Sequence, residues 1–66
     1  MEIGMVKWYN IQYGFGLIET KDDDIIVFSS DIIMDGYARL TEGQRVQFNV
    51  TITDKGSRAM NVEVIL

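Results

Sequence analysis

Cysteine and histidine are both absent from the 66-residue chain. Without cysteine there is no disulfide framework, and without either residue there is no ordinary zinc or iron site, so we expect neither a metal nor another cofactor. The missing histidine removes the commonest general base, and the missing cysteine removes the best nucleophile. No carboxylate pair suited to acid–base chemistry and no glycine-rich loop before a helix takes their place. The composition therefore argues against an enzyme.

Positive charge is also scarce, with six Lys and Arg residues against ten Asp and Glu residues and a net charge of −4 at pH 7. Taken alone, this balance argues against a polyanionic partner, because counterion release needs clustered cations, although a local patch can dominate at contact. No stretch approaches the ~20 apolar residues of a membrane span, and no basic leader precedes an apolar run. We therefore expect a soluble cytoplasmic protein with no membrane partner.

The chain has room for one small domain, covering residues 1–66, with no linker or repeat. Short runs of β-type residues alternate with turn signals. The expected strands are Ile3–Tyr9, Phe15–Thr20, Ile25–Phe28, Gln44–Thr53 and Ala59–Leu66. A capped helical turn is expected at Ser29-Ser30-Asp31, and a turn at Asp54-Lys55-Gly56-Ser57. Five strands without a long helix predict a small, all-β, closed barrel, since an open sheet would leave two edges and one face uncovered.

Strand alternation divides the side chains into two faces. The predicted core residues are Val6, Ile18, Ile25, Val27, Val46, Phe48, Val50, Val62 and Val64. The large apolar side chains left facing outward on the second and third strands are Phe15, Leu17, Ile26 and Phe28. Such a group is a liability unless something binds there, and Gly14 and Gly16 leave room for another backbone or a flat ligand to approach. A partner subunit packed against these strands is the alternative explanation.

The acidic run Asp22-Asp23-Asp24 could suggest a binding site for a hard cation, but its geometry argues against one. Alternate side chains diverge along an extended chain, and the run lacks the alternating ligand pattern of a calcium loop. We interpret it as a solvated hairpin loop, which would also repel a nucleic-acid backbone and confine binding to one face.

Two motifs connect the chain to a known family. Val6-Lys7-Trp8-Tyr9-Asn10 and Gly14-Phe15-Gly16-Leu17-Ile18 resemble the V-K-W-F-N and K-G-F-G-F-I patterns of the bacterial cold-shock domain family. The segment from Asp24 to Ser30 resembles its D-V-F-V-H-F-S pattern, and further matches follow in order along the rest of the chain. RNA-recognition-motif domains carry a similar G-F-G string, but they need two helices that this sequence lacks. The resemblance implies a five-stranded antiparallel Greek-key barrel of the OB type that binds single-stranded RNA or DNA.

The resemblance also implies roles for individual residues. Lys7 would contact phosphate, Trp8 and Phe15 would stack on bases, and Asp24 would accept hydrogen bonds from a base edge. Strict alternation would bury Trp8 beside Val6, so an exposed Trp8 requires a bulge near Lys7, with Tyr9 as a partly buried support. Lys55 and Arg58 flank the last turn, where a phosphate contact and ordinary solvated charge are equal alternatives. The predicted nucleic-acid-binding residues are Lys7, Trp8, Tyr13, Phe15, Leu17, Asp24, Ile26, Phe28, Tyr37, Lys55 and Arg58.

Departures from the family pattern affect this surface. Against that pattern, Leu17, Ile26 and Ser29 replace Phe, Phe28 replaces His, and Tyr13 replaces Lys. Flat stacking area is lost at Leu17, Ile26 and Ser29 and gained at Tyr13 and Phe28. Stacking of one base on an aromatic side chain contributes ~1–3 kcal/mol to the binding free energy. Losing one phosphate-contacting Lys should make the salt dependence shallower by about 0.7 in the log–log slope. We therefore predict weakened or altered affinity.

Two functions are compatible with these features. The first is a cold-shock-like RNA chaperone or expression regulator in the stress response, which traps unpaired segments. The second is a protein-interaction barrel that has lost nucleic-acid affinity, motivated by the apolar patch of Leu17, Ile26 and Phe28 and by the acidic balance. That patch could also support a homodimer.

Overall fold

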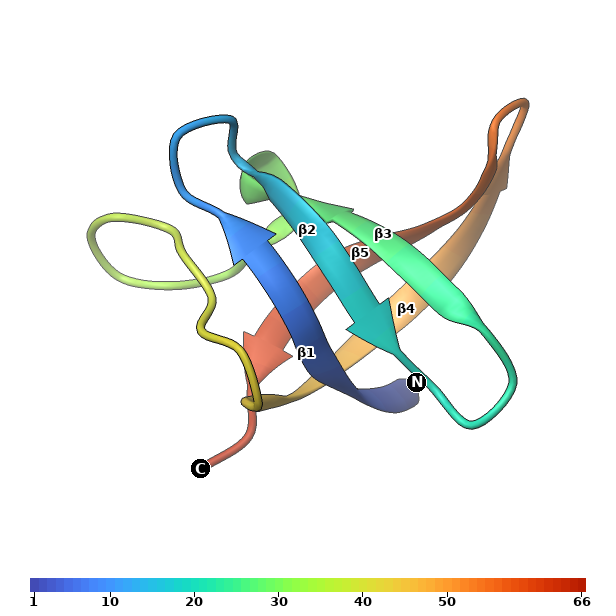
Figure 1. The fold of residues 1–66 in the computed structure, drawn as a ribbon, viewed down its shortest axis with the longest axis horizontal. Coiled ribbons are helices and arrows are strands. Elements are labelled where there is room, and N and C mark those ends of the chain that lie inside the picture. The colour runs from blue at the N-terminus through green and yellow to red at the C-terminus, as the bar shows by residue number, and fades with distance from the viewer.

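The computed structural model describes residues 1–66 and forms one closed barrel of five strands in the order β1-β2-β3-β5-β4 (Figure 1). The elements are β1 (Glu2–Asn10), β2 (Phe15–Glu19), β3 (Asp24–Phe28), the 3₁₀ turn η1 (Ser29–Asp31), β4 (Arg45–Thr53) and β5 (Gly56–Val64). The barrel confirms the predicted all-β fold of the OB type. All pairings are antiparallel except that of β3 with β5, because strand direction cannot alternate all the way around a ring of five.

Both turns predicted near the strand ends differ in detail from expectation. The β4–β5 turn is tighter than predicted, because Gly56 has a φ of 116° and already pairs with Thr53, so β5 begins three residues before Ala59. The Thr53 hydroxyl donates a 2.8 Å hydrogen bond to the Gly56 carbonyl across this turn. The expected side-chain cap of η1 is missing, because Phe28 occupies the cap position and has no polar side chain.

No helix of the structure has the length and hydrophobicity needed to cross a membrane.

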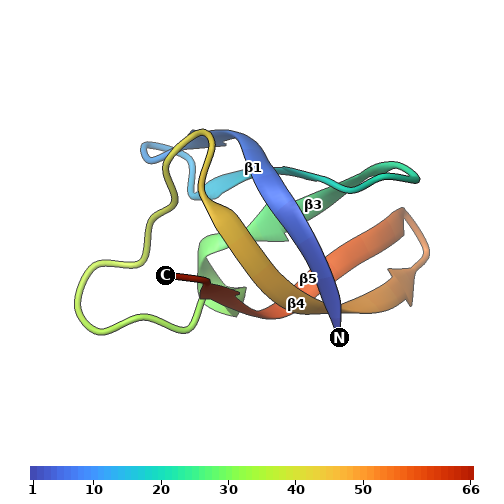
Figure 2. The ribbon, with the colours of Figure 1, turned by 90° about the horizontal axis from the view of Figure 1, so that it is seen from below.

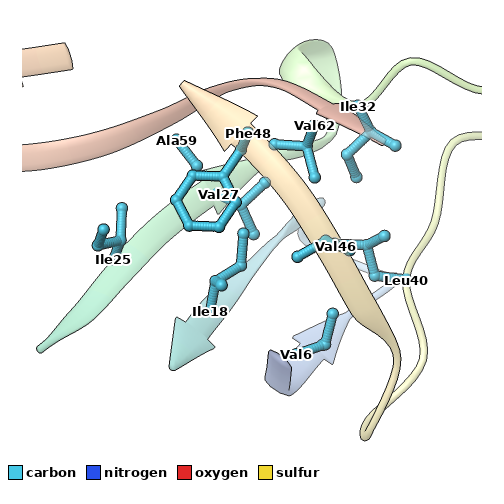
Figure 3. Close-up of a cluster of buried hydrophobic side chains, with 10 residues drawn as sticks. All are labelled: Val6, Ile18, Ile25, Val27, Ile32, Leu40, Val46, Phe48, Ala59 and Val62. Atoms are coloured by element: carbon cyan, nitrogen blue, oxygen red, sulfur yellow. The ribbon is translucent and has the colours of Figure 1, made fainter. Parts of the chain in front are cut away.

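Ten buried hydrophobic residues form the core inside the barrel (Figure 3). They are Val6, Ile18, Ile25, Val27, Ile32, Leu40, Val46, Phe48, Ala59 and Val62. Seven of the nine predicted core residues are among them, and Val64 is half-buried against the cluster. Ile32, Leu40 and Ala59 were not predicted. Ile32 and Leu40 lie in the irregular segment between η1 and β4, where no alternation marks them.

The prediction that Val50 belongs to the core is wrong. Val50 is 38% exposed, and Ile52, further along the same face of β4, is 76% exposed. The reason is the neighbouring strand: β1 pairs with β4 only from Met5 to Glu2, and Glu2 lies opposite Phe48. Beyond Phe48 the β4–β5 hairpin therefore extends past the rest of the barrel and its inner face is uncovered (Figures 1 and 2).

Candidate nucleic-acid interface

A bulge in β1 turns Trp8 towards solvent. Val6 pairs with Ile18 of β2, but Trp8 pairs with Leu17, so Lys7 is an extra residue in β1. The side chain of Val6 is consequently buried, whereas Trp8 is 38% exposed. The predicted break in alternation near Lys7 is confirmed, and Tyr9 is half-buried against the core as expected of a support.

Gly16 allows β2 to approach β1 closely beyond this bulge. A Cβ atom at Gly16 would lie 2.9 Å from the Tyr9 Cα and 2.9 Å from the Tyr9 ring, and it would also overlap the Trp8 carbonyl. The backbone that the sequence led us to expect beside this glycine is thus β1 of the same molecule. No flat ligand fits on this side of β2, because the protein itself fills the space.

The predicted outward face is continuous across three strands. We call Trp8, Phe15, Leu17, Ile26 and Phe28 the outer apolar surface. Trp8 pairs with Leu17, Leu17 with Ile26, and Phe15 with Phe28. On β2 and β3 these half-buried side chains alternate with residues that are fully buried. The sheet therefore presents its apolar side chains in adjacent rows.

At one end of this surface three rings gather, and we call Trp8, Tyr13 and Phe15 the aromatic end. The ring centroids of Trp8 and Phe15 lie 5.5 Å apart with an interplanar angle of 77°, an edge-to-face contact. Tyr13 is 72% exposed, and its ring centroid lies 6.5 Å from that of Phe15 at 34°. The Tyr13 amide donates a 3.0 Å hydrogen bond to Asn10 Oδ1, which fixes the loop that carries the ring.

Lys7 and Asp24, predicted as separate ligand contacts, are bound to each other. Lys7 Nζ donates a 2.9 Å hydrogen bond to Asp24 Oδ2. This hydrogen bond, together with the negative charge of Asp24, raises the pKa of Lys7. A phosphate that approaches Lys7 must compete with this carboxylate, because phosphate and carboxylate are both anionic oxygen acceptors for the lysine ammonium group.

Arg58 is also paired within the protein, at the opposite end of the surface. Its Nε and Nη2 atoms lie 2.8 and 2.7 Å from Asp31 Oδ2, and its Cζ lies 4.6 Å from the centroid of the Phe28 ring. We call Ile26, Phe28 and Arg58 the arginine end. Sequence analysis missed Asp31, because 27 residues separate it from Arg58 and only the parallel pairing of Ile26 with Arg58 brings the two regions together.

A hollow of about 410 Å³ adjoins the arginine end. Its lining residues are Ile26, Phe28, Thr53, Asp54, Lys55, Ser57 and Arg58. Lys55, at the tip of the β4–β5 hairpin, is exposed and forms no ion pair, in contrast to Arg58. Tyr37 lies in the segment between η1 and β4 and is 71% exposed, and its ring makes no contact with those of Trp8, Tyr13 or Phe15.

Tyr9 lies beneath the aromatic end with a buried hydroxyl group. That oxygen has no hydrogen-bond partner of good geometry, although the Ser29 side chain is close enough to influence it. Burial raises the pKa of Tyr9, and Ser29 opposes the rise only in part. Both positions depart from the family pattern described above, so a polar pair stands there in place of two phenylalanines.

Comparison with known proteins agrees with this architecture. Residues 2–65 match the model of the 'Cold-shock' DNA-binding domain. The chain is 52% identical over 64 residues to the cold shock-like protein CspD of Haemophilus influenzae, an alignment that covers 94% of this chain and 89% of that protein. It is 48% identical over 63 residues to the cold shock proteins CspA of Staphylococcus aureus and Staphylococcus haemolyticus, covering 94% of this chain and 96% of each relative. The chain belongs to the cold-shock domain family.

Proposed function

We propose that this protein binds single-stranded RNA or DNA, without catalysis, by stacking unpaired bases on the outer apolar surface. The observation that carries the proposal is the contact between Trp8 and Phe15, whose partly exposed rings meet with centroids 5.5 Å apart. Every base has a flat π-face, so exposed rings accept bases with little regard to sequence. Tyr13, which is more exposed still, extends this area beside Phe15.

The proposed binding depends more on stacking than on charge. Lys7 and Arg58, two of the cations that flank the outer apolar surface, are each neutralised by an aspartate, and Lys55 beside the arginine end is unpaired. Leu17 and Ile26 offer apolar contact without a ring, so the stacking is concentrated at the aromatic end. We therefore propose an altered affinity, with fewer phosphate contacts than a basic surface of the same size would make.

In the cell, binding of this kind would hold RNA segments unpaired. A protein that stacks on exposed bases favours the single-stranded state, because those bases are unavailable in a duplex. We propose that the protein acts in this way in the cytoplasm as an RNA chaperone or expression regulator of the cold-shock type. Tyr37 and Lys55 would contribute further contacts, Lys55 from the hollow beside the arginine end.

Fluorescence of Trp8, the single tryptophan, tests this function directly. Seven-residue oligomers of thymidine and of uridine are titrated at low salt, and we expect saturable quenching by at least one of them. Phe15→Ala should remove most of the affinity. The matched control is Ile3→Ala, which truncates a 55% exposed side chain of β1 outside the outer apolar surface and should bind normally. A folded wild-type protein that shows no quenching with either oligomer, and no binding by anisotropy of labelled oligomers, would overturn the proposal.

A further inference from the structure

Arg58 is held in one orientation by two neighbours. Asp31 Oδ2 accepts a hydrogen bond from Nε and forms an ion pair with Nη2, and the Phe28 ring lies beneath the guanidinium group. The Asp31 side chain is only 10% exposed, whereas that of Arg58 is 35% exposed. Leaving a nearly buried carboxylate without its partner would cost free energy, because the charge would lose both its hydration and its counter-ion. The ion pair therefore persists in the free protein.

This arrangement changes what the arginine end offers to a ligand. The guanidinium group covers one face of the Phe28 ring, so that face is closed to a base. Asp31 neutralises the positive charge, which weakens attraction to phosphate. The structure provides no other acceptor for Arg58, so three of its five N–H groups remain free, and one on Nη1 lies parallel to one on Nη2 in a fixed plane.

The adjoining hollow can receive a flat group beside these donors. Its volume of about 410 Å³ falls within the range of small-molecule sites, about 300–1,000 Å³. Ile26 and Phe28 provide apolar contact, and Arg58 lines the same space. Two parallel N–H donors of an arginine match the O6 and N7 acceptors of guanine, while the exocyclic amino group of adenine would face them with a donor.

We infer that Asp31 is a positioning residue that holds Arg58 as a guanine-selective contact in the hollow beside β3 and β5. The inference rests on the proposed function and adds a base preference to it. Arg58 then acts as an oriented pair of donors and not as a phosphate-binding cation. Its contribution to affinity depends on the identity of one base and only weakly on salt.

Base substitution in one oligomer measures this preference. One guanine, inosine or adenine replaces a single thymine of a seven-residue thymidine oligomer, at each position in turn, and dissociation constants are measured with wild-type protein. We expect guanine and inosine, which share O6 and N7, to bind about tenfold more tightly than adenine at the best position, as one bidentate contact allows. Equal binding of guanine and adenine at every position would overturn the inference.

Variants of the ion pair separate positioning from a structural effect. Asp31→Asn should reduce the guanine preference to threefold or less and make the salt dependence steeper by up to about 0.7, since Arg58 is freed to meet phosphate. Asp31→Glu should restore part of the preference. Arg58→Lys keeps the charge but loses the planar donors, so it should abolish the preference. A guanine preference that stays at about tenfold in both Asp31→Asn and Arg58→Lys would contradict the assignment.

The matched control is Asp54→Asn, which removes one carboxylate charge from the lining of the hollow and leaves the pairing of Arg58 with Asp31 unchanged. It should retain the guanine preference. If Asp31→Asn instead weakened binding to all oligomers equally with the preference intact, Asp31 would be a structural residue and the inference would fall. Failure of the proposed function has a different signature, because wild-type protein would then not bind even the unsubstituted thymidine oligomer.

Discussion

The aromatic end and the arginine end lie on the same sheet but are built differently. At the aromatic end Trp8 and Phe15 contact each other edge to face, and their rings remain partly open to solvent. At the arginine end the Phe28 ring is covered by a guanidinium group that Asp31 holds in place. In the proposed function, one end would therefore offer aromatic surface to any base, and the other would offer oriented donors to a particular one.

In the proposed function, this difference would explain how an acidic protein presents a surface for a polyanion. The net charge is −4, and of the cations beside the outer apolar surface Lys7 and Arg58 are paired with aspartates, which leaves Lys55 unpaired. Long-range attraction to phosphate would consequently be weak, and the proposed binding would have to come from contacts made at short range. Stacking and base-edge donors are contacts of that kind, because neither needs a net positive field.

The largest expected effect comes from removing the close approach that supports the aromatic end. Gly16→Ala would place a methyl group 2.9 Å from the Tyr9 Cα, and backbone atoms cannot yield as a flexible side chain does. We expect a loss of about 2–3 kcal/mol in the free energy of unfolding, measured by urea denaturation, as for an overpacked core. Gly43→Ala is a useful contrast, because its Cβ would meet nothing within 4 Å and its positive φ is the sole source of strain. Equal losses in the two variants would show that crowding against β1 is unimportant.

Truncating one ring at each end compares the two directly. Phe15→Ala should weaken binding to a thymidine oligomer by about 2 kcal/mol, within the ~1–3 kcal/mol range of one stacked base. Phe28→Ala should cost less than half of that, because Arg58 already covers one face of its ring. Dissociation constants from anisotropy give both values. Equal losses would mean that Phe28 stacks as freely as Phe15.

Removing the buried Tyr9 hydroxyl group beneath the aromatic end should have a smaller effect on stability. Tyr9→Phe removes an oxygen that has no partner of good geometry, so the free energy of unfolding should rise by about 1 kcal/mol. Burial raises the pKa of Tyr9, so the unfolded state loses this proton first as the pH rises above 10. The stability of the wild type should then fall relative to Tyr9→Phe as the pH rises above 10. A constant difference across that range would contradict burial of the neutral phenol.

The smallest effect is expected from the ion pair beside the aromatic end. Asp24→Asn keeps an acceptor but removes the charge that holds Lys7. Binding to single strands at low salt should become about threefold tighter, with a log–log salt slope steeper by about 0.7, because Lys7 can then neutralise one phosphate. Weaker binding with an unchanged slope would show instead that the charged carboxylate is itself a ligand contact.

The sequence predicted the strands and the faces well, because alternation is a local property of the chain. Phe15 and Leu17 lie on the outer face of β2 and Ile18 lies on its inner face, as expected. The exposure of Trp8, by contrast, was predicted only through the family resemblance. The side-chain pairings were not predicted. The ion pairs join residues 17 and 27 positions apart and depend on register across the barrel. Val50 was misplaced for a related reason, since alternation along β4 does not reveal where β1 ends.

Salt dependence of binding distinguishes a stacking surface from a cationic one. The dissociation constant of a seven-residue thymidine oligomer is measured by Trp8 fluorescence from 20 to 500 mM salt, in the wild type and in Phe15→Ala. If the paired cations contribute little, the log–log slope should be close to 1 in magnitude, which is one or two neutralised phosphates at about 0.7 each, and Phe15→Ala should weaken binding at every salt concentration. A slope above 2, with binding that persists in Phe15→Ala at low salt, would show that charge and not stacking holds the strand.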